Sequence, residues 1–478
     1  MLSDPITYVC LLYLALVTAV GLVMPLQARD RGLLEYFLAG RGIGPIVLAL
    51  SLGVTTLGAI GLVLLINQDI HSQGPALLVL AVVISLLVIL GTVVAPRYLA
   101  ARVMTTPDLV AQRFGRGTGF SLGVGYVLLI VLVRLPMILL GGSYVLSALS
   151  GWEPLTTAML ILVVAGLYTT AGGFPSVVFT QAMHGGAVAL SVLALLVISL
   201  AGQPLVVDLP VARASGLPPV TVALFVTSMA IVALWYFWAD QFVAQRVLSA
   251  RSAIDARRGV LLAVAFVSVV ALLGLNITGA GTVLDGPPPP HPVSSLLGAV
   301  LVLSLTVSAV SGLLQSAAAV ITLDIVRPFQ KAATELSLVL VGRLSTTGVA
   351  VVVLLLVSAL GPLSPEGLLR FLDAHLAVAP PAAAIFIGVL FVRRMTAQGA
   401  MAALFVGAVL GVAFMGLPPE WNLPAQTFTV VSFALSMTLL VLVSYLSRDP
   451  ARKQARTPVD EPIGEAMESG RADAVASR

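Results

Sequence analysis

The sequence predicts an all-α polytopic membrane protein, and three observations support this fold class. Of the 478 residues, 59% are hydrophobic and only 10% are charged, whereas soluble domains average about 25% charged residues. Thirteen apolar stretches approach the length of about 20 residues with which a helix crosses a bilayer. Basic residues gather in alternate connections between these stretches. The composition argues against a cytosolic enzyme, a secreted disulfide scaffold and a nucleic-acid-binding protein.

The thirteen predicted transmembrane helices are spread over nearly the whole chain. The first lacks a basic leading segment and a small-x-small cleavage site, so we interpret it as a retained span rather than a signal peptide. The stretches run near 6–25, 43–67, 75–95, 119–149, 155–171, 182–202, 219–239, 260–281, 294–321, 340–360, 379–393, 396–416 and 426–447.

The distribution of Lys and Arg predicts the orientation of the chain. With thirteen spans, 22 of the 25 basic residues fall on one side, Arg213 and Arg370 fall on the other, and Arg134 lies inside a span. Because cytoplasmic loops carry the excess of Lys and Arg, we expect the N-terminus outside and the C-terminus in the cytoplasm. The expected location is the cell membrane, crossed many times.

Residues 1–447 are predicted to form one transmembrane domain, followed by a tail at 448–478. The tail is polar and charged and contains three prolines, so we expect it to be disordered and cytoplasmic. The proline-rich connection at 286–292 should be a stiff, extended outer loop. The expected partners are a small-molecule solute and the lipid bilayer, with no nucleic acid and no obligatory protein partner.

Two spans carry polar or flexible residues that a purely structural helix does not need. In the second span, Gly53 and Gly58 flank Thr55 and Thr56. This pattern is typical either of an unwound helix that lines a cavity or of a small-residue packing face. The ninth span repeats hydroxyl and amide side chains, which indicates a wet or ion-lined face, although hydroxyls also bond back to their own helix. These residues are Ser304, Thr306, Ser308, Ser311, Gln315 and Ser316.

Arg134 is the most informative single residue, because it lies near the middle of the fourth span. A charge at that depth costs several kcal/mol in lipid, so the side chain should face the protein interior or a cavity. A guanidinium matches a carboxylate in a bidentate geometry, which favours binding of an anionic substrate. The alternative is a structural role beside the helix break that Pro136 makes.

Other candidate residues allow two interpretations each. His184 is either a proton relay or a packed histidine. The run from Trp235 to Trp238 is either an interfacial aromatic belt or a gate over a cavity. No His, Cys, Asp and Glu cluster has metal spacing, and no phosphate loop or nucleophile triad is present. We therefore predict a protein that is not an enzyme and carries no cofactor.

Six motifs, taken in order, resemble the sodium:solute symporter family, which includes the sodium/glucose cotransporters and bacterial proline permeases. The similarity runs from about residue 6 to 447. The fifth motif pairs Asp240-Gln241 with Gln245-Arg246, and the last is Thr322-Leu323-Asp324. The others are Tyr36 to Arg41, the stretch from Ser51 onward, Thr106-Pro107-Asp108-Leu109 with Arg113-Phe114-Gly115, and Tyr168 to Gly173 with Thr180.

The resemblance implies a leucine-transporter-like architecture. Spans 2–6, at about 43–202, would repeat with inverted topology as spans 7–11, at about 219–393, and the core helices would be broken. The first core helix would be unwound from Ser51 onward. The solute would bind midway through the membrane, and one bundle would rock against the other to give alternating access.

The resemblance also implies a sodium site between the second and ninth spans. Its ligands would be the carbonyls of Val54, Leu57 and Leu305 and the hydroxyl of Ser308. Ala309 takes the place of a second family hydroxyl, which should weaken sodium binding. Three further positions on ion paths depart from the family, so coupling to protons, or uncoupled exchange, remains an alternative. They are Thr56, where members often carry Asp or Asn, Gln181, where they carry Asp, and His184, where they carry Gln.

The resemblance and Arg134 together predict the class of solute. Tyr236 falls at the inner aromatic gate of the sugar-transporting branch, but Ala233 replaces that branch's Asn. Some members that carry acidic solutes use an Arg in the fourth span. We therefore predict sodium-coupled symport of a small carboxylate, with a non-transporting membrane sensor as a further alternative. The predicted solute-binding residues are Arg134, Thr55, Thr56, Trp235 and Tyr236.

Overall fold

The computed structural model describes residues 5–24, 32–66, 76–202, 218–278, 292–330, 332–417, 421 and 423–447. Within these ranges the chain is helical, and the extended pairing consists of one isolated bridge between Ile43 and Ala250. The predicted disordered tail at 448–478 and residues 286–291 of the predicted stiff loop lie outside the described residues, and Pro292 begins a helix.

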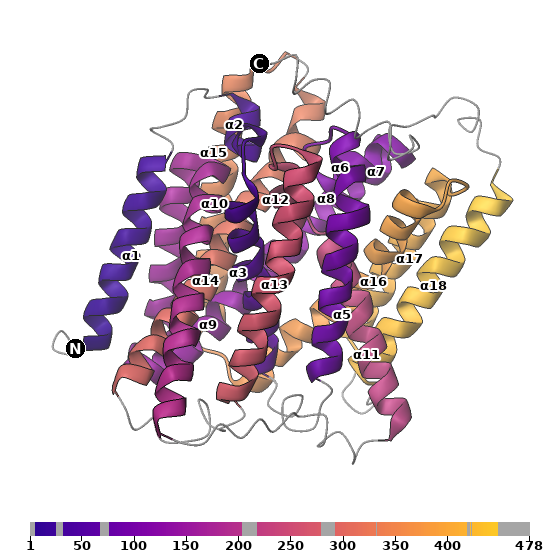
Figure 1. Cartoon of the computed structure of the whole chain (residues 1–478). Coiled ribbons are helices and arrows are strands. Elements are labelled where there is room, and N and C mark those ends of the chain that lie inside the picture. Colours follow the sequence, from indigo (N-terminus) through magenta and orange to yellow (C-terminus); the bar gives the residue numbers. More distant parts are fainter. Residues whose placement is uncertain are drawn as a thin grey trace.

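The long helices run along a common direction, and shorter helices lie towards one end (Figure 1). The long ones are α1 (Pro5–Val23), α3 (Pro45–Ile66), α5 (Ala76–Ile89), α8 (Arg116–Leu129), α9 (Leu135–Ser150), α10 (Pro154–Gly202), α11 (Pro219–Leu234), α13 (Ala253–Thr278), α14 (Pro292–Val320), α15 (Glu335–Leu360), α16 (Pro365–Phe391), α17 (Ala397–Met415) and α18 (Ala425–Leu446). The short ones are α2 (Leu33–Leu38), α6 (Ala95–Ala100), α7 (Thr106–Phe114) and α12 (Gln241–Leu248).

Several helices continue directly into a turn of π- or 3-10 helix. A π-turn, which inserts one extra residue, rotates the side chains that follow it and is frequent at functional sites. The π-turns are η3 (Leu90–Val94), η4 (Ile130–Arg134), η6 (Trp235–Ala239) and η7 (Ile321–Val326), and the 3-10 turns are η2 (Ala39–Arg41) and η8 (Arg327–Phe329). As a result, α8 and α9 form one continuous span around η4.

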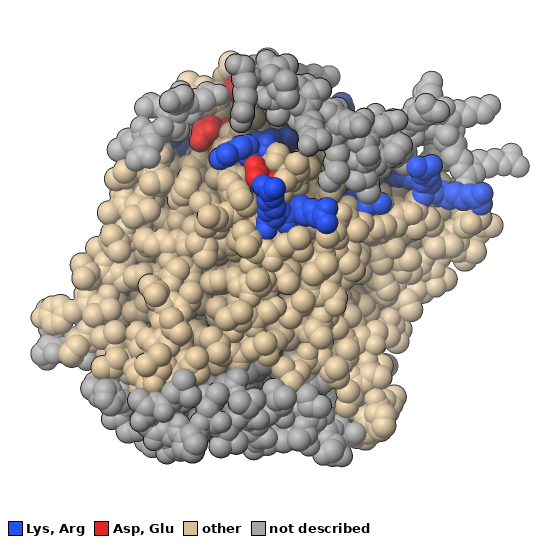
Figure 2. Space-filling view, viewed as in Figure 1, with Lys and Arg blue, Asp and Glu red and all other residues tan. Residues whose placement is uncertain are grey.

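The outer surface has the polarity that a bilayer requires. A broad band around the middle shows no Lys, Arg, Asp or Glu in the view of Figure 2, and the visible charged side chains gather at the end where α2, α6 and α7 lie. Large apolar side chains such as Leu190, Leu355 and Phe405 are exposed. Surface of this kind is stable only in contact with lipid, so the chain is a multi-pass membrane protein.

The described residues contain eleven helices that are long and apolar enough to cross a membrane, where the sequence predicts thirteen spans. One difference is α3, whose apolar part over Pro45–Gly58 is counted among the shorter helices. The other is α10, which has 49 residues and a non-helical Gly173 with φ +64° and ψ −150°.

Hydrogen bonds to α1 show that α10 turns back on itself at Gly173. Trp152, just before α10, donates to Thr7 at the start of α1, over 2.9 Å. Ser176 donates to the carbonyl of Gly21 near the end of α1, and His184 contacts Tyr13 midway along it. A straight helix cannot visit the start, the end and the middle of its neighbour in that order. The two halves of α10 are therefore antiparallel.

The predicted unwinding of the second span is wrong, because α3 is helical throughout Pro45–Ile66. Its threonine hydroxyls bond back to their own helix: Thr55 donates to Ser51 O at 3.0 Å and Thr56 to Leu52 O at 2.8 Å. Gly53 serves close packing instead. A Cβ on Gly53 would overlap Phe266 of α13, and one on Gly58 would lie 3.5 Å from the carbonyl oxygen of Leu305 on α14.

A core helix is broken elsewhere, in the seventh predicted span. Here α11 continues into η6 and stops at Asp240, whose backbone is extended with φ −72° and ψ 124°. The chain then starts α12 at Gln241, with Asp240 as its N-cap. Breaks at this depth expose backbone groups, which survive only inside the protein. In agreement, every residue of η6 and α12 is buried.

Replacing Gly173 with Ala should strongly lower the stability of the fold. Its backbone lies in a region that essentially only glycine adopts, at a cost of about 1–3 kcal/mol for other residues, and a Cβ would overlap Tyr36. Gly186→Ala, on the same helix with nothing within 4 Å of the added Cβ, is the matched control. Thermal unfolding of both variants in detergent checks this; equal melting temperatures would contradict the turn at Gly173.

Candidate functional site

A buried ion pair joins the middle of the fourth span to the break in the seventh. An Nη of Arg134 donates to a carboxylate oxygen of Asp240 over 2.6 Å, and the two side chains are 4% and 0% exposed. Arg134 ends the π-turn η4, and Pro136 follows in the first turn of α9. Asp240 is available because the helix stops there. A charge within the membrane is thus met by an opposite charge, as burial requires.

The second oxygen of Asp240 is also bound. The hydroxyl of Tyr126 donates to it over 2.5 Å, and the Phe242 amide donates to the same carboxylate oxygen over 2.9 Å. The Phe242 amide also lies 2.9 Å from the Tyr126 oxygen. Both oxygens of the carboxylate therefore have partners, and Asp240 is held in one orientation.

Aromatic rings enclose the guanidinium of Arg134. Its central carbon lies 5.2 Å from the ring centroid of Trp235, 5.7 Å from that of Tyr236 and 5.4 Å from that of Phe242. His375 of α16 packs edge-on against Trp235, with ring centroids 4.9 Å apart. Contacts of this kind stabilise a cation most where water is excluded.

The aromatic run of the seventh span lies inside the protein. Trp235, Tyr236, Phe237 and Trp238 are all buried, so they do not form an interfacial belt. The hydroxyl of Tyr236 donates to the carbonyl of Thr55 over 3.1 Å, which links η6 to α3.

The structure brings together most of the predicted solute-binding residues. Arg134, Trp235 and Tyr236 share one buried cluster, and Thr55 joins it through its backbone carbonyl. Thr56 is buried, but its hydroxyl stays within α3. Sequence reasoning missed Asp240, Tyr126, Phe242 and His375. Of these, only Asp240 carried a signal, because it belongs to the fifth of the matched motifs.

The predicted sodium ligands lie where α3 packs against α14. A small cavity of about 20 Å³ lies there, enough for one water-sized particle. Close by along α14, the hydroxyl of Ser308 is fully buried and has no hydrogen-bond partner among the described residues. Buried polar groups are nearly always paired, so this oxygen is available to a ligand. The cavity is lined by Gly58, Ile138, Gly142, Val145, Val302, Leu305, Thr306 and Ala309.

Val54 and Leu57 lie on the buried face of α3. Because α3 is helical there, their carbonyls take part in the helix rather than being released by unwinding. Leu305 and Ala309 line the cavity directly, and Ala309 presents a methyl group to it.

Gln181 and His184 face the same side of α14. The amide of Gln181 donates to the Ser308 carbonyl over 2.9 Å, and its oxygen accepts from Ser51 at 2.7 Å. One turn later, the Tyr13 hydroxyl lies 2.6 Å from Nδ1 of His184 and 2.8 Å from Oγ of Ser304. These contacts form a polar seam between α10 and α14, defined as Gln181, His184, Ser304 and Ser308.

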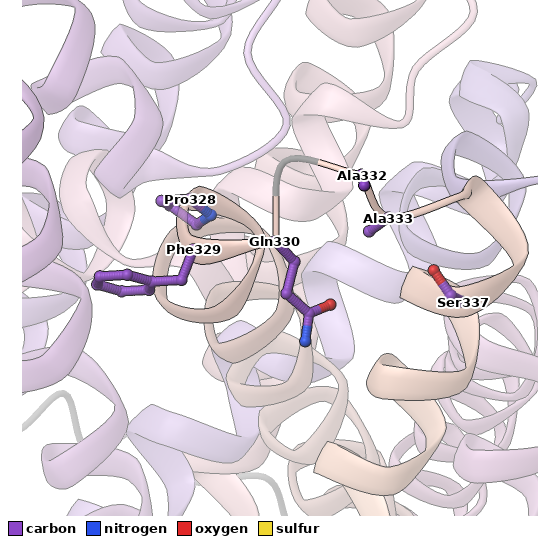
Figure 3. A pocket seen from close by; sticks show the side chains of 6 residues that line it. All are labelled: Pro328, Phe329, Gln330, Ala332, Ala333 and Ser337. Atoms are coloured by element: carbon purple, nitrogen blue, oxygen red, sulfur yellow. The ribbon is translucent and has the colours of Figure 1, made fainter.

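A larger hollow of about 690 Å³ lies elsewhere, at the charged end of the molecule. It is an open surface depression between η8 and α15, lined by Pro328, Phe329, Gln330, Ala332, Ala333 and Ser337 (Figure 3). None of these side chains is charged, and none belongs to the Arg134 cluster. We do not assign the solute site to it.

Removing one member of the Arg134–Asp240 pair should destabilise the protein more than removing both. Arg134→Gln or Asp240→Asn leaves a buried charge unpaired, at a cost of about 3–5 kcal/mol. The double variant removes both charges and should recover much of that loss. Thermal unfolding of the singles, the double and the exposed control Arg258→Gln measures the cycle. Additive losses in the double variant would show that the pair is not coupled.

Comparisons with known proteins agree with this architecture. The sodium/mannose cotransporter of Bos taurus is 27% identical over 96% of this chain and 90% of its own length. The sodium/myo-inositol cotransporter of Mus musculus is 23% identical over 93% and 74%. A solved structure of a Na⁺-coupled sialic acid symporter, substrate-bound and outward-open, superposes with a TM-score of 0.78 at 16% identity, over 92% of this chain and 97% of that one.

A second solved structure, the nucleobase-cation-symport-1 transporter Mhp1, has a TM-score of 0.56 at 15% identity and covers 89% of this chain and 98% of its own. These neighbours confirm the predicted fold class of a leucine-transporter-like membrane protein. The family model described as "Sodium:solute symporter family" matches residues 36–283 and 289–407. The chain therefore belongs to the sodium:solute symporter family.

Proposed function

We propose that this protein imports a small organic carboxylate together with sodium, by alternating access. The observation that carries the proposal is the Arg134 cluster: a guanidinium buried in mid-membrane, enclosed by aromatic rings. Only one Nη of Arg134 has a described hydrogen bond, to Asp240. A guanidinium has five N–H donors, so donors remain for the carboxylate of a solute.

The relatives differ in the solutes for which they are named. The curated cotransporters are named for mannose and myo-inositol, and the solved symporter for sialic acid. The buried guanidinium of this chain suits an acid better than a neutral polyol, because a carboxylate engages it by charge-assisted, bidentate bonds. Monocarboxylates, amino acids and acidic sugars are the candidate classes.

Sodium fits the electrostatics of the proposed site. Arg134 and Asp240 neutralise one another, so an entering carboxylate makes the buried site more negative by one charge. A sodium ion at the predicted α3–α14 site binds more favourably once that charge is present, which couples the two ligands without direct contact. The residues that would hold it are Ser308, through its unpartnered hydroxyl, and the backbone around Leu305.

We also propose the orientation and location of the protein. The charged end in Figure 2 would face the cytoplasm, as the excess of Lys and Arg requires. The N-terminus would then lie outside, and the protein would be in the cell membrane.

Coupling to protons is the second candidate, and His184 is the observation that favours it. Ser304 donates to the Val300 carbonyl over 2.6 Å, so Tyr13 donates to Ser304 and accepts from Nδ1–H of His184. This assignment leaves Nε2 as a bare acceptor, and it is buried without a partner among the described residues. A neutral imidazole of this kind can take up a proton during transport.

Uptake into proteoliposomes tests the function and separates the two candidates. We expect an inward sodium gradient, but not a potassium gradient, to drive accumulation of a labelled carboxylate from a panel of monocarboxylates, amino acids and acidic sugars. Neutral sugars and myo-inositol serve as the comparison set. Uptake that depends on the pH gradient and not on sodium would support proton coupling through His184 instead.

Ala309→Ser should strengthen sodium activation of uptake. The added hydroxyl enters the cavity beside Leu305 and supplies one more oxygen ligand, an interaction worth about 1 kcal/mol, or roughly fivefold in affinity. Ala317→Ser, at a fully buried position further along α14, is the matched control. The half-saturating sodium concentration is the readout; an unchanged value in Ala309→Ser would place the ion elsewhere.

A further inference from the structure

Arg246 is a fully buried arginine without a described carboxylate partner. It lies on α12 and is 1% exposed. Asp240, the acid of the nearby ion pair, binds Arg134, and no carboxylate oxygen of the described residues lies within 4.0 Å of the Arg246 nitrogens. An uncompensated buried charge is costly, and nothing in the proposed transport site so far uses it.

Hydrogen bonds lead from Arg246 to the predicted sodium site. Its Nε donates to Ser51 over 3.1 Å, and one Nη donates to the side-chain oxygen of Gln181 over 2.8 Å. The amide of Gln181 in turn donates to the carbonyl of Ser308. One side chain therefore separates the guanidinium from the residue whose hydroxyl lacks a partner.

The guanidinium also lies directly against α14. Gly312 follows Ser308 by one helical turn, and a Cβ at Gly312 would be 2.7 Å from an Nη of Arg246 and 2.7 Å from the Gln181 nitrogen. Only a residue without a side chain leaves this space. The absence of a Cβ at Gly312 thus permits Arg246 to approach the ion-binding face of α14.

The two arginines of the site share one aromatic ring. The guanidinium carbon of Arg246 lies 4.2 Å from the ring centroid of Phe242, and that of Arg134 lies 5.4 Å from it. With Asp240 as the one carboxylate of this cluster, its formal charge is +1. In the low dielectric of the interior, this charge opposes a second cation and attracts an anion.

We propose that Arg246 couples sodium binding to solute binding. Its uncompensated charge lowers the sodium affinity of the solute-free protein, and a bound carboxylate offsets the charge, so that sodium binds tightly only together with solute. The proposal rests on the proposed symport of a carboxylate. Gln181 is central to it, because a neutral amide stands where a carboxylate would pair with the guanidinium.

The test measures sodium binding to the purified full-length protein without solute. NaCl is titrated against KCl at constant ionic strength, and the sodium midpoint of thermal stabilisation is recorded. Arg246→Gln and Gln181→Glu each remove the excess charge and should lower the midpoint by about tenfold or more, since like charges are strongly coupled at such sites. Arg246→Lys keeps the charge and should keep the wild-type midpoint, as should Arg258→Gln, which removes an exposed charge on α13.

A second measurement covers the case in which Arg246→Gln fails to fold. Adding a carboxylate that the protein transports should lower the sodium midpoint of the wild type by a similar factor. The same addition should have much less effect in Gln181→Glu, where the guanidinium already has a partner.

Three outcomes would contradict the proposal. Unchanged midpoints in both charge-removing variants would show that Arg246 does not influence the ion. A lower midpoint in Gln181→Glu alone, with folded Arg246→Gln unchanged, would show that the new carboxylate acts as a sodium ligand. An equal solute effect in the wild type and Gln181→Glu would separate Arg246 from the anion. If sodium stabilises neither the wild type nor any variant and drives no uptake, the proposed symport itself is wrong.

Discussion

The pairing of Arg134 with Asp240 is the interaction on which the centre of this molecule depends. A lone arginine in mid-membrane is costly. Asp240 can pair with it because the helix of the seventh span stops there. The same break frees the Phe242 amide for Tyr126 and Asp240, and places the aromatic residues of η6 around the guanidinium. One ion pair thus connects the fourth span, the helix break and the aromatic enclosure.

Small residues set how closely the other core helices approach this pair. Gly58 and Gly142 border the cavity beside α14, and Gly312 makes room for Arg246 and Gln181. Lipid tails are as apolar as the helices, so the hydrophobic effect does not drive membrane helices together. They associate instead through such close contacts and through polar bonds. Ser304 and Ser308 of the polar seam and Gly312, against which Arg246 lies, follow one another by single turns along α14.

The fold and the position of Arg134 were predictable because they follow from composition and from burial of charge. The unwinding of α3 was mispredicted, since a glycine-flanked threonine pair is equally suited to packing, and Gly53 and Gly58 pack against Phe266 and Leu305. The break at Asp240 was hidden in an aromatic run that is also typical of a membrane interface. No local pattern indicates that Asp240, 106 residues from Arg134, is its partner. Long-range pairing of this kind is a property of the folded chain.

The charges of the site predict a coupling between the binding of solute and the binding of sodium. Because coupling is reciprocal, the affinity for solute must change by the same factor as the affinity for sodium. The most direct measurement is a calorimetric titration of a transported carboxylate into the purified protein, in sodium and in potassium at equal ionic strength. Cooperative binding at the two sites predicts a dissociation constant that is lower in sodium by about tenfold or more, a difference of about 1.4 kcal/mol. Equal dissociation constants in the two salts would contradict it.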